Sequence, residues 1–251
     1  MRAGGLKGKS LKIFAGLAGS YELTLDLATM YQDRRWKDWV ARKLVFSHSG
    51  LVLDIGCGTL VLEDRMAKGG LKFVGLDLSA EMILVAKAKS ASNVALLTNA
   101  DAEFLPFPGG SFDAVVSCYV PKYVDAEAFA KELARVTRPG AHAAVYDFAK
   151  PRGALAPLLQ MYIRCGLRAV GVCLALARRR EATTFKDLPK IIEDTRWDSE
   201  LPLALGRCGF EMIETARMTG GVVFAYWGRK GGGNISEDGL PARATNEVGR
   251  P

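Results

Sequence analysis

The sequence is poor in the features that build disulfide frameworks, zinc sites and membrane spans. Its five cysteines are odd in number and include no Cys-x-x-Cys pair, which argues against a disulfide framework and a zinc site and favours reduced thiols in the cytoplasm. No stretch reaches the ~18 uninterrupted apolar residues of a membrane-spanning helix. A signal peptide is disfavoured, because Lys12 interrupts a short apolar stretch near the N-terminus. We therefore expect a cytoplasmic protein without a metal centre.

Charge gives little reason to expect a nucleic-acid partner. The formal net charge is +7, but it is spread along the chain, with local clusters at 34–43 and 178–180. A solvated helix face is the favoured interpretation of such clusters. No appended RNA-binding module is visible in the sequence. With 251 residues, of which 49% are apolar, the chain can hold one sizeable core plus appendages.

Residues 51–59, Leu-Val-Leu-Asp-Ile-Gly-Cys-Gly-Thr, predict the element around which the chain is organised. The apolar run has no polar alternation, so it suits a strand that is covered on both faces of a parallel sheet. Gly56 and Gly58 follow at its carboxyl end, where glycine lets the backbone bend sharply and lets a ligand approach it. A helical pattern over residues 60–68 then points its first N–H groups into the same crevice. Strand, loop and helix together predict a nucleotide-type pocket.

An alternation of strands and helices predicts the fold class. Seven stretches are expected to be strands: 51–55, 72–77, 93–98, 112–118, 141–148, 210–218 and 222–230. Helices are expected at 60–68, 79–90 and 125–137. Strands that alternate with helices pair in parallel, and the last two stretches are typical of a hairpin. We predict an α/β fold of the Rossmann-like type, with a doubly wound, mostly parallel seven-stranded sheet and an antiparallel C-terminal hairpin strand.

The segments around this core predict a cap, an insert and a tail. The expected parts are an N-terminal helical cap at 1–48, a cofactor-binding core at 49–150, a helical insert or substrate cap at 151–208, a sheet-completing hairpin at 209–230 and a disordered tail at 231–251. The tail begins Gly-Gly-Gly-Asn and has too little apolar surface to fold. Gly166 and Gly171 are candidate breaks in the first helix of the insert.

The residues around the glycine turn distinguish between nucleotides. The dinucleotide fingerprint needs a third glycine, and Val61 stands at that position. Three acids at successive strand ends favour S-adenosylmethionine instead. Asp54 precedes the turn and can orient the ammonium group of the ligand, while Asp77, which Leu78 follows, can accept from both ribose hydroxyls. Asp101 can accept from the adenine amino group. Each acid alone is as readily a turn residue, but three in one crevice indicate a site.

Longer motifs extend this interpretation over residues 10–230. The widely shared motifs are 53–59, Phe-Asp-Ala-Val at 112–115 and Arg-Pro-Gly at 138–140. The more specific motifs are 14–37 (Phe14, Ala18, Tyr21-Glu22-Leu23, Asp26-Leu27, Arg34, Trp36-Lys37), 102–108, Asp-Phe-Ala-Lys-Pro at 147–151 and 219–230. On these motifs the chain resembles the class I methyltransferases, and within them the ubiquinone and menaquinone biosynthesis C-methyltransferases.

The resemblance implies S-adenosylmethionine as cofactor and assigns contacts to it. The implied contact residues are Thr59, Asp77, Asp101, Ala102 and Cys118. Three departures from the family pattern stand out. Leu60 replaces the glycine that follows the threonine, Leu25 replaces an asparagine, and 118–123 replaces the family's Ser-Phe-Gly-Leu-Arg-Asn beside the substrate.

The same resemblance implies a prenylated quinol or naphthoquinol ring as methyl acceptor. A base, or a group that favours the phenolate, would help its reaction. Asp147 at the end of the fifth strand is the first candidate; the alternative is a strand-end acid paired with a nearby lysine or arginine. Tyr119 and Lys122 either bind an acidic substrate group or belong to a solvated loop. Tyr21 and Trp36 either cover the ring or pack the cap helix.

Several alternatives stay open. Residues 152–180, apolar and basic, either lie on the anionic inner face of a membrane or pack over the active site. The chain could also be a class I methyltransferase for another small molecule, acting at O, N or another carbon, or a non-catalytic cofactor-binding subunit. A nucleic-acid methyltransferase is disfavoured, since no Asn/Asp-Pro-Pro-Tyr loop follows the fourth strand. The oligomeric state stays unknown at this level.

Overall fold

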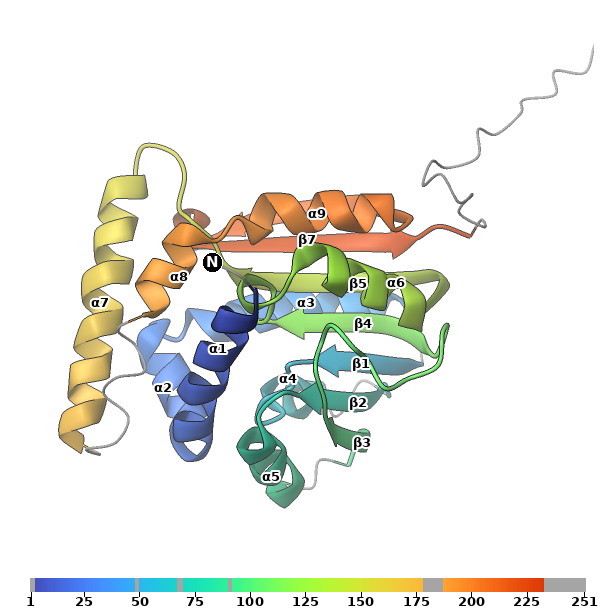
Figure 1. Cartoon of the computed structure of the whole chain (residues 1–251), viewed down its shortest axis with the longest axis horizontal. Coiled ribbons are helices and arrows are strands. Elements are labelled where there is room, and N and C mark those ends of the chain that lie inside the picture. The colour runs from blue at the N-terminus through green and yellow to red at the C-terminus, as the bar shows by residue number, and fades with distance from the viewer. Residues whose placement is uncertain (1–2, 48–49, 67–69, 90–91, 178–186, 233–251) are drawn as a thin grey trace, which may run out of the picture.

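Seven strands form one sheet in the order β3-β2-β1-β4-β5-β7-β6 (Figure 1). The computed structural model describes residues 3–47, 50–66, 70–89, 92–177 and 187–232. The strands are β1 (Leu51–Ile55), β2 (Lys72–Asp77), β3 (Val94–Asn99), β4 (Phe112–Cys118), β5 (Thr137–Phe148), β6 (Phe210–Met218) and β7 (Val223–Lys230). Strands β1 to β5 pair in parallel, and β7 is inserted antiparallel between β5 and β6. The predicted fold class is confirmed.

The sheet is buried on both faces, which explains its continuous apolar strands. Successive side chains of a strand point to opposite faces, so Val52 and Leu53 enter two different cores. One core includes Val52, Phe73 and Val116; the other includes Leu53 and Val115. A polar residue within β1 would therefore be buried whichever way it pointed, and Asp54 is such a residue.

Helices cover both faces and the carboxyl ends of the parallel strands (Figure 1). They are α1 (Ala3–Leu17), α2 (Tyr21–Ala28), α3 (Gln32–Ser47), α4 (Val61–Arg65), α5 (Ala80–Lys89), α6 (Ala126–Val136), α7 (Ala156–Ala177), α8 (Leu188–Asp194) and α9 (Trp197–Arg207). Helices α6 and α9 lie on one face and α3 on the other. Helices α1, α2, α7 and α8 gather at the end to which β1 and β4 point (Figure 1). None of the helices within the described ranges is long and apolar enough to cross a membrane.

Three sequence-based expectations differ from the structure. Strand β5 begins at Thr137 rather than 141, because the backbone after α6 extends at once; Phe112 pairs with Thr137 and Ala114 with His142, so the intervening residues bulge. Helix α7 runs through Gly166 and Gly171 without a break. Helix α4 spans only Val61–Arg65. The expected tail lies outside the described residues from 233 on, as does the basic cluster at 178–180.

Candidate functional site

A cavity of about 620 Å³ lies at the carboxyl ends of the parallel strands, under α1. We call it the main cavity. It is lined by Lys7, Ser10, Phe14, Tyr21, Ile55, Gly56, Gly58, Leu76, Asp77, Leu78, Met82, Ala100, Asp101, Ala102, Cys118, Tyr119, Val120, Tyr123 and Val124. Seven of the nine residues predicted to bind a cofactor therefore meet in one cavity; Asp54 and Thr59 are the exceptions.

The glycine turn forms one wall of the main cavity. Gly56 has a φ of +80°, and a Cβ atom there would lie 2.2 Å from Val120 Cγ2, so the close approach requires glycine. The Asp77 carboxylate accepts hydrogen bonds from the backbone N–H groups of Gly58 at 2.9 Å and Ser79 at 2.8 Å. Burial raises the pKa of Asp77, against the effect of these N–H donors. Asp77 thus ties the second strand to the loop while it faces the cavity.

Leu60 follows Thr59 at the position where the family has glycine, yet the backbone of the turn keeps a conformation typical of glycine. Leu60 adopts φ +64° and ψ 34°, the left-handed conformation. Its side chain is fully buried and packs with Cys57, Ile83 and Ala86. The departure in sequence therefore adds a buried side chain without removing the left-handed turn.

Asp101 has an unpredicted partner, Lys7 of α1. The Lys7 ammonium donates to both carboxylate oxygens of Asp101, at 2.7 and 3.0 Å, and lies 2.6 Å from Glu103. These contacts hold α1 across the adenine side of the predicted site. No local pattern signals a pair that is 94 positions apart.

A second, apolar cavity of about 490 Å³ adjoins the main cavity. Its lining residues are Phe14, Leu17, Tyr21, Thr24, Leu25, Ala28, Tyr119, Lys122, Tyr123, Phe148, Leu167 and Leu188. Tyr21 and Tyr119 line both cavities. Of the described residues that line the apolar cavity, Lys122 alone carries a charge.

The Lys122 side chain is fixed by Asp147, the residue predicted as a base. Lys122 Nζ donates to Asp147 Oδ1 at 2.6 Å and to the Tyr119 carbonyl at 2.9 Å. Both side chains of this ion pair are buried. Burial lowers the pKa of Lys122 and raises that of Asp147, and each partner offsets part of the other's shift. Asp147 lines neither cavity, so the structure favours the alternative interpretation, a strand-end acid paired with a lysine.

Trp36 likewise follows its packing interpretation. It is buried, its indole N–H donates to Thr219 Oγ1 at 3.1 Å, and its ring meets Phe148 edge to face at 5.8 Å. It lines none of the cavities described here. Trp36 is therefore a core residue rather than a cover over the ring.

Thr59, which was predicted to contact the cofactor, does not line the main cavity. Its hydroxyl donates to Glu22 at 2.9 Å.

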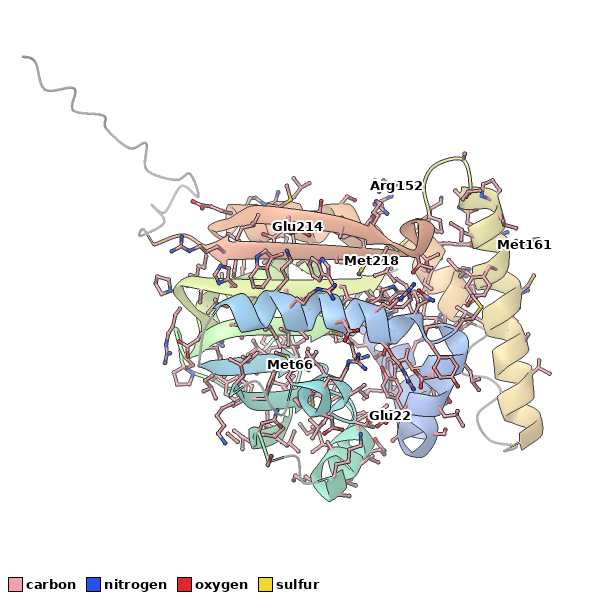
Figure 2. The ribbon with its side chains drawn as sticks, turned by 180° about the vertical axis from the view of Figure 1, so that it is seen from behind. Glu22, Met66, Arg152, Met161, Glu214 and Met218 are labelled. Carbon is pink, nitrogen blue, oxygen red and sulfur yellow. The ribbon has the colours of Figure 1, made fainter. Side chains whose placement is uncertain are left out.

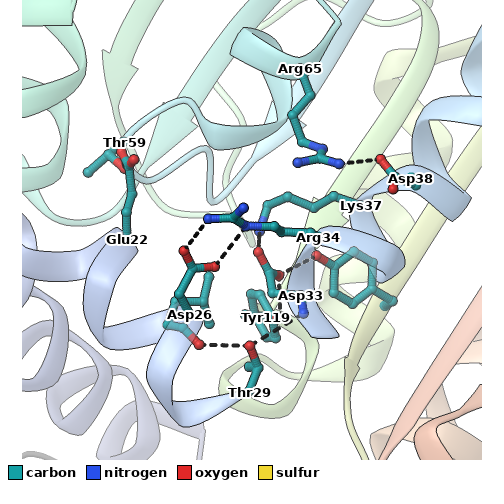
Figure 3. Close-up of polar contacts among 12 residues, drawn as sticks. Glu22, Asp26, Thr29, Asp33, Arg34, Lys37, Asp38, Thr59, Arg65 and Tyr119 are labelled. Carbon is teal, nitrogen blue, oxygen red and sulfur yellow. Dashed lines mark hydrogen bonds and ion pairs between the residues drawn. The ribbon is translucent and has the colours of Figure 1, made fainter. Parts of the chain in front are cut away.

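A buried polar network between α3 and the sheet was missed by sequence reasoning (Figure 3). Lys37 Nζ lies 2.5 Å from Asp33 Oδ2, and Asp33 Oδ1 accepts from the Tyr119 hydroxyl at 2.6 Å. The i, i+4 spacing of Asp33 and Lys37 on a helix was the available signal. Lys37 and Asp54 line a third cavity, of about 300 Å³, together with Gly56, Gly58 and Tyr21.

The residues of the main cavity fit S-adenosylmethionine. The cavity has a glycine loop that permits close approach and carboxylates at the ends of β2 and β3. Buried next to the loop, Asp54 Oδ1 accepts no hydrogen bond from any residue in the described ranges. A cationic, hydroxyl-rich ligand would satisfy these acceptors.

Comparisons with known proteins agree with this fit. Residues 53–145 match the family described as "Methyltransferase domain". The demethylmenaquinone methyltransferase of Tropheryma whipplei is 30% identical over 224 residues, covering 88% of this chain and 91% of that protein. The one from Mycobacterium marinum is 32% identical over 223 residues, covering 87% and 92%.

Solved structures share the fold. An Aquifex aeolicus SAM-dependent methyltransferase superposes with a TM-score of 0.54 at 18% identity, covering 77% of this chain and 88% of that one. Magnesium protoporphyrin IX methyltransferase from Synechocystis, solved with bound SAH, gives a TM-score of 0.54 at 19% identity, covering 79% and 83%. The chain belongs to the class I S-adenosylmethionine-dependent methyltransferases, and among them it is similar to the demethylmenaquinone methyltransferases.

Proposed function

We propose that this methyltransferase methylates a ring carbon of a prenylated hydroquinone of the menaquinone or ubiquinone type. The observation that carries the proposal is the apolar cavity, which adjoins the main cavity at Tyr21 and Tyr119 and holds one buried cation, Lys122. An aromatic ring with a hydrocarbon tail suits apolar walls, and an ionised phenol suits a single cation. The names of the similar proteins support the same class of acceptor.

Lys122 is the residue that favours the phenolate in this proposal. Two of its three N–H groups donate to Asp147 and to the Tyr119 carbonyl, and the third can donate to a phenolate oxygen. The phenol releases its proton to solvent, and this ionisation makes the neighbouring ring carbon electron-rich. S-adenosylmethionine supplies an electrophilic methyl group on a sulfonium. The ring carbon forms the new C–C bond, the S–C bond breaks with its electrons left on sulfur, and the ring carbon then loses its proton to water. Tyr21 and Tyr119 exclude solvent from the space between the methyl donor and the ring carbon, and not from the side on which water takes the proton.

The test is methyl transfer from labelled S-adenosylmethionine to reduced demethylmenaquinone and to a lipid extract, with products identified by mass spectrometry. We expect a ring-methylated quinol, and we expect Lys122→Met to lower kcat about 100-fold while the affinity for S-adenosylhomocysteine stays unchanged. Lys131→Met, a charge removed from the surface of α6, is the control. Label on a different class of compound in the extract, with none on any quinol, would contradict the proposal and indicate a methyltransferase for another small molecule.

We further propose that the protein meets its prenylated substrate at the cytoplasmic face of a membrane through α7. The outer side of α7 carries the exposed residues Leu158, Met161 and Val172, at helical spacing, and Figure 2 shows Met161 on the side that faces away from the rest of the chain. Arg168 is exposed on the same helix and suits an anionic surface. The inner side of α7 supplies Leu167 to the apolar cavity, so one helix would connect bilayer and substrate site.

Flotation with anionic liposomes tests this contact. Met161→Asp is expected to reduce the bound fraction several-fold, because it places a charge in the apolar stripe. Met212→Asp is a matched control on β6, since Met212 is 62% exposed and Met161 57%. Equal binding of wild type and both variants would overturn the membrane contact without affecting the proposed chemistry.

A further inference from the structure

Two hydroxyl groups without a partner belong to residues that line the apolar cavity. They are those of Thr24 on α2 and of Tyr123, and these residues are only 2% and 3% exposed. Within the described ranges, neither Thr24 Oγ1 nor the Tyr123 hydroxyl makes a hydrogen bond. A hydroxyl that is removed from water without such a bond destabilises the fold. Two of them on one cavity are therefore better explained by a ligand than by the fold.

The contrast with a neighbouring threonine shows that the fold leaves Thr24 free. Threonine in a helix commonly donates its hydroxyl to a backbone carbonyl one turn earlier. Thr29, at the end of α2, makes this bond to the Leu25 carbonyl at 2.8 Å. Thr24 makes no such bond in the described part of the chain, so its hydroxyl remains available on the cavity.

The Tyr123 hydroxyl lies apart from the cation of the same cavity. Lys122 Nζ lies over the face of the Tyr123 ring, 4.4 Å from its centroid, whereas a tyrosine hydroxyl lies in the plane of its ring, at the rim. Burial, together with the Asp147 charge, holds the pKa of Tyr123 well above its usual range, so the hydroxyl keeps its proton and can donate. The cavity therefore offers one cation and, separately, two neutral hydroxyls.

Both hydroxyls belong to segments in which the chain departs from the family pattern. Thr24 precedes Leu25, which stands where the family has asparagine, and Tyr123 ends the replaced segment 118–123. Leu25 itself lines the apolar cavity with a hydrocarbon side chain. The polar groups on this cavity thus differ from those of the family pattern, and what they select is a property of this chain.

On the basis of the proposed function, we propose that Thr24 and Tyr123 bind the second ring oxygen of the hydroquinone and so select acceptors that carry both oxygens. A hydroquinone has oxygens at opposite sides of its ring, and Lys122 favours ionisation of the one beside the methylated carbon. The other stays a neutral hydroxyl, which can accept one hydrogen bond and donate another. Thr24 and Tyr123 supply these two partners, and binding satisfies all three hydroxyls. The two residues determine specificity and transfer no proton.

Two acceptors that differ by one hydroxyl test this inference. A short-chain reduced demethylmenaquinone carries both ring hydroxyls, and the matching naphthol keeps only the one beside the methylated carbon. The ratio of kcat/KM for the two is compared between wild type and variants, so that the intrinsic reactivities of the two rings cancel. Thr24→Val, which keeps the shape of the side chain, should reduce the preference for the diol about tenfold, the effect of one lost hydrogen bond. Tyr123→Phe should reduce it similarly, and kcat/KM for the naphthol should not fall in either variant.

Two further variants serve as controls. Thr24→Ser keeps the hydroxyl and should keep the wild-type ratio. Tyr226→Phe removes a different buried hydroxyl, one that also lacks a partner within the described residues but belongs to β7 and lies outside the apolar cavity. It should keep the wild-type ratio as well. Since the lost hydroxyls of Thr24→Val and Tyr123→Phe have no partner in the fold, both variants should unfold at or above the wild-type temperature.

The outcomes separate this inference from the proposed function. If wild type methylates the diol, and Thr24→Val and Tyr123→Phe keep its preference, the inference is wrong and the proposed function stands. An equal loss of activity toward both acceptors overturns the inference too, because it would mean that the hydroxyls only shape the cavity. If wild type methylates neither acceptor, both proposals fail. Should Thr24→Val not fold, the ratios of Thr24→Ala and Tyr123→Phe decide in the same way.

Discussion

The Tyr119 hydroxyl donates a 2.6 Å hydrogen bond to Asp33 Oδ1 on α3. The Tyr119 backbone carbonyl accepts from Lys122 Nζ. Tyr119 therefore connects the Asp33–Lys37 ion pair beside the third cavity to the Lys122–Asp147 ion pair beside the apolar cavity. Its backbone adopts φ +66°, a left-handed conformation that costs a non-glycine residue about 1–2 kcal/mol. The side-chain and carbonyl hydrogen bonds offset that cost. Tyr119 therefore fixes the geometry of both cavities at once.

Removal of this hydroxyl should destabilise the fold more than removal of an ordinary buried one. Tyr119→Phe loses a hydrogen bond to a charged acceptor and should lower the free energy of unfolding by about 1.5–3 kcal/mol. Tyr162→Phe is the matched control, because its hydroxyl donates to a neutral acceptor, the Ala28 carbonyl, at 3.0 Å, and should cost about 1 kcal/mol. Urea denaturation measures both. Equal losses of unfolding free energy in the two variants would show that the hydrogen bond from Tyr119 to the Asp33 carboxylate stabilises the fold no more than a bond to a neutral carbonyl.

Much of the sheet and of the main cavity could be predicted from local sequence. Apolar runs that end in Gly56, Asp77 and Asp101 specify parallel strands, and the carboxyl ends of such strands converge by topology alone. That is why these three residues line one cavity. The start of β5 was harder, because Arg-Pro-Gly at 138–140 is a typical helix stop and here forms part of a bulged strand.

The tertiary partners of the polar side chains could not be predicted in the same way. Asp147 was a candidate base because it ends a strand, but its role depends on Lys122, which a turn after β4 brings within 2.6 Å. Trp36 follows its packing alternative, and its partner was equally hidden in the sequence, since Thr219 lies in the C-terminal hairpin. Side chains pair across elements, and a single sequence records only the spacing within them.

Asp54 should make stability depend on pH. Its pKa is about 7 in the folded protein, against 3.8 ordinarily, so between these values the folded state holds a proton that the unfolded state releases. The free energy of unfolding should fall as pH rises through this window, by about 1.4 kcal/mol per pH unit for each proton that only the folded state holds. Burial and the Asp54 charge also raise the pKa of the neighbouring Glu63, so both carboxyls contribute to the fall. Asp54→Asn should therefore reduce the slope between pH 5 and 7 in urea unfolding without cofactor. Asp38→Asn, on the surface of α3, is the control; an Asp54→Asn slope equal to that of the wild type would contradict the assignment.

At Leu60 a strained left-handed backbone destabilises the fold, while the buried side chain stabilises it. Leu60→Gly relieves about 1 kcal/mol of left-handed strain but empties a fully buried site, which costs about 2–5 kcal/mol, so packing wins and the variant is less stable. Leu60→Ala empties most of the same site and keeps the strain. We therefore expect the glycine variant to be at least as stable as the alanine variant, the reverse of the usual order. Thermal denaturation decides, and an alanine variant more stable by 1 kcal/mol or more would show that the turn is unstrained.

Lys7 should compete with the cofactor for Asp101. Both Asp101 oxygens accept from Lys7, whereas the predicted adenine contact needs at least one of them. Lys7→Met should therefore raise the affinity for S-adenosylhomocysteine and for 5′-methylthioadenosine by the same few-fold factor, because both ligands carry adenine. Lys9→Met, which removes a more exposed lysine from the same helix, should leave both affinities unchanged. Weaker binding of both ligands by Lys7→Met would instead mean that α1 closes over the bound nucleoside and that Lys7 is part of the site.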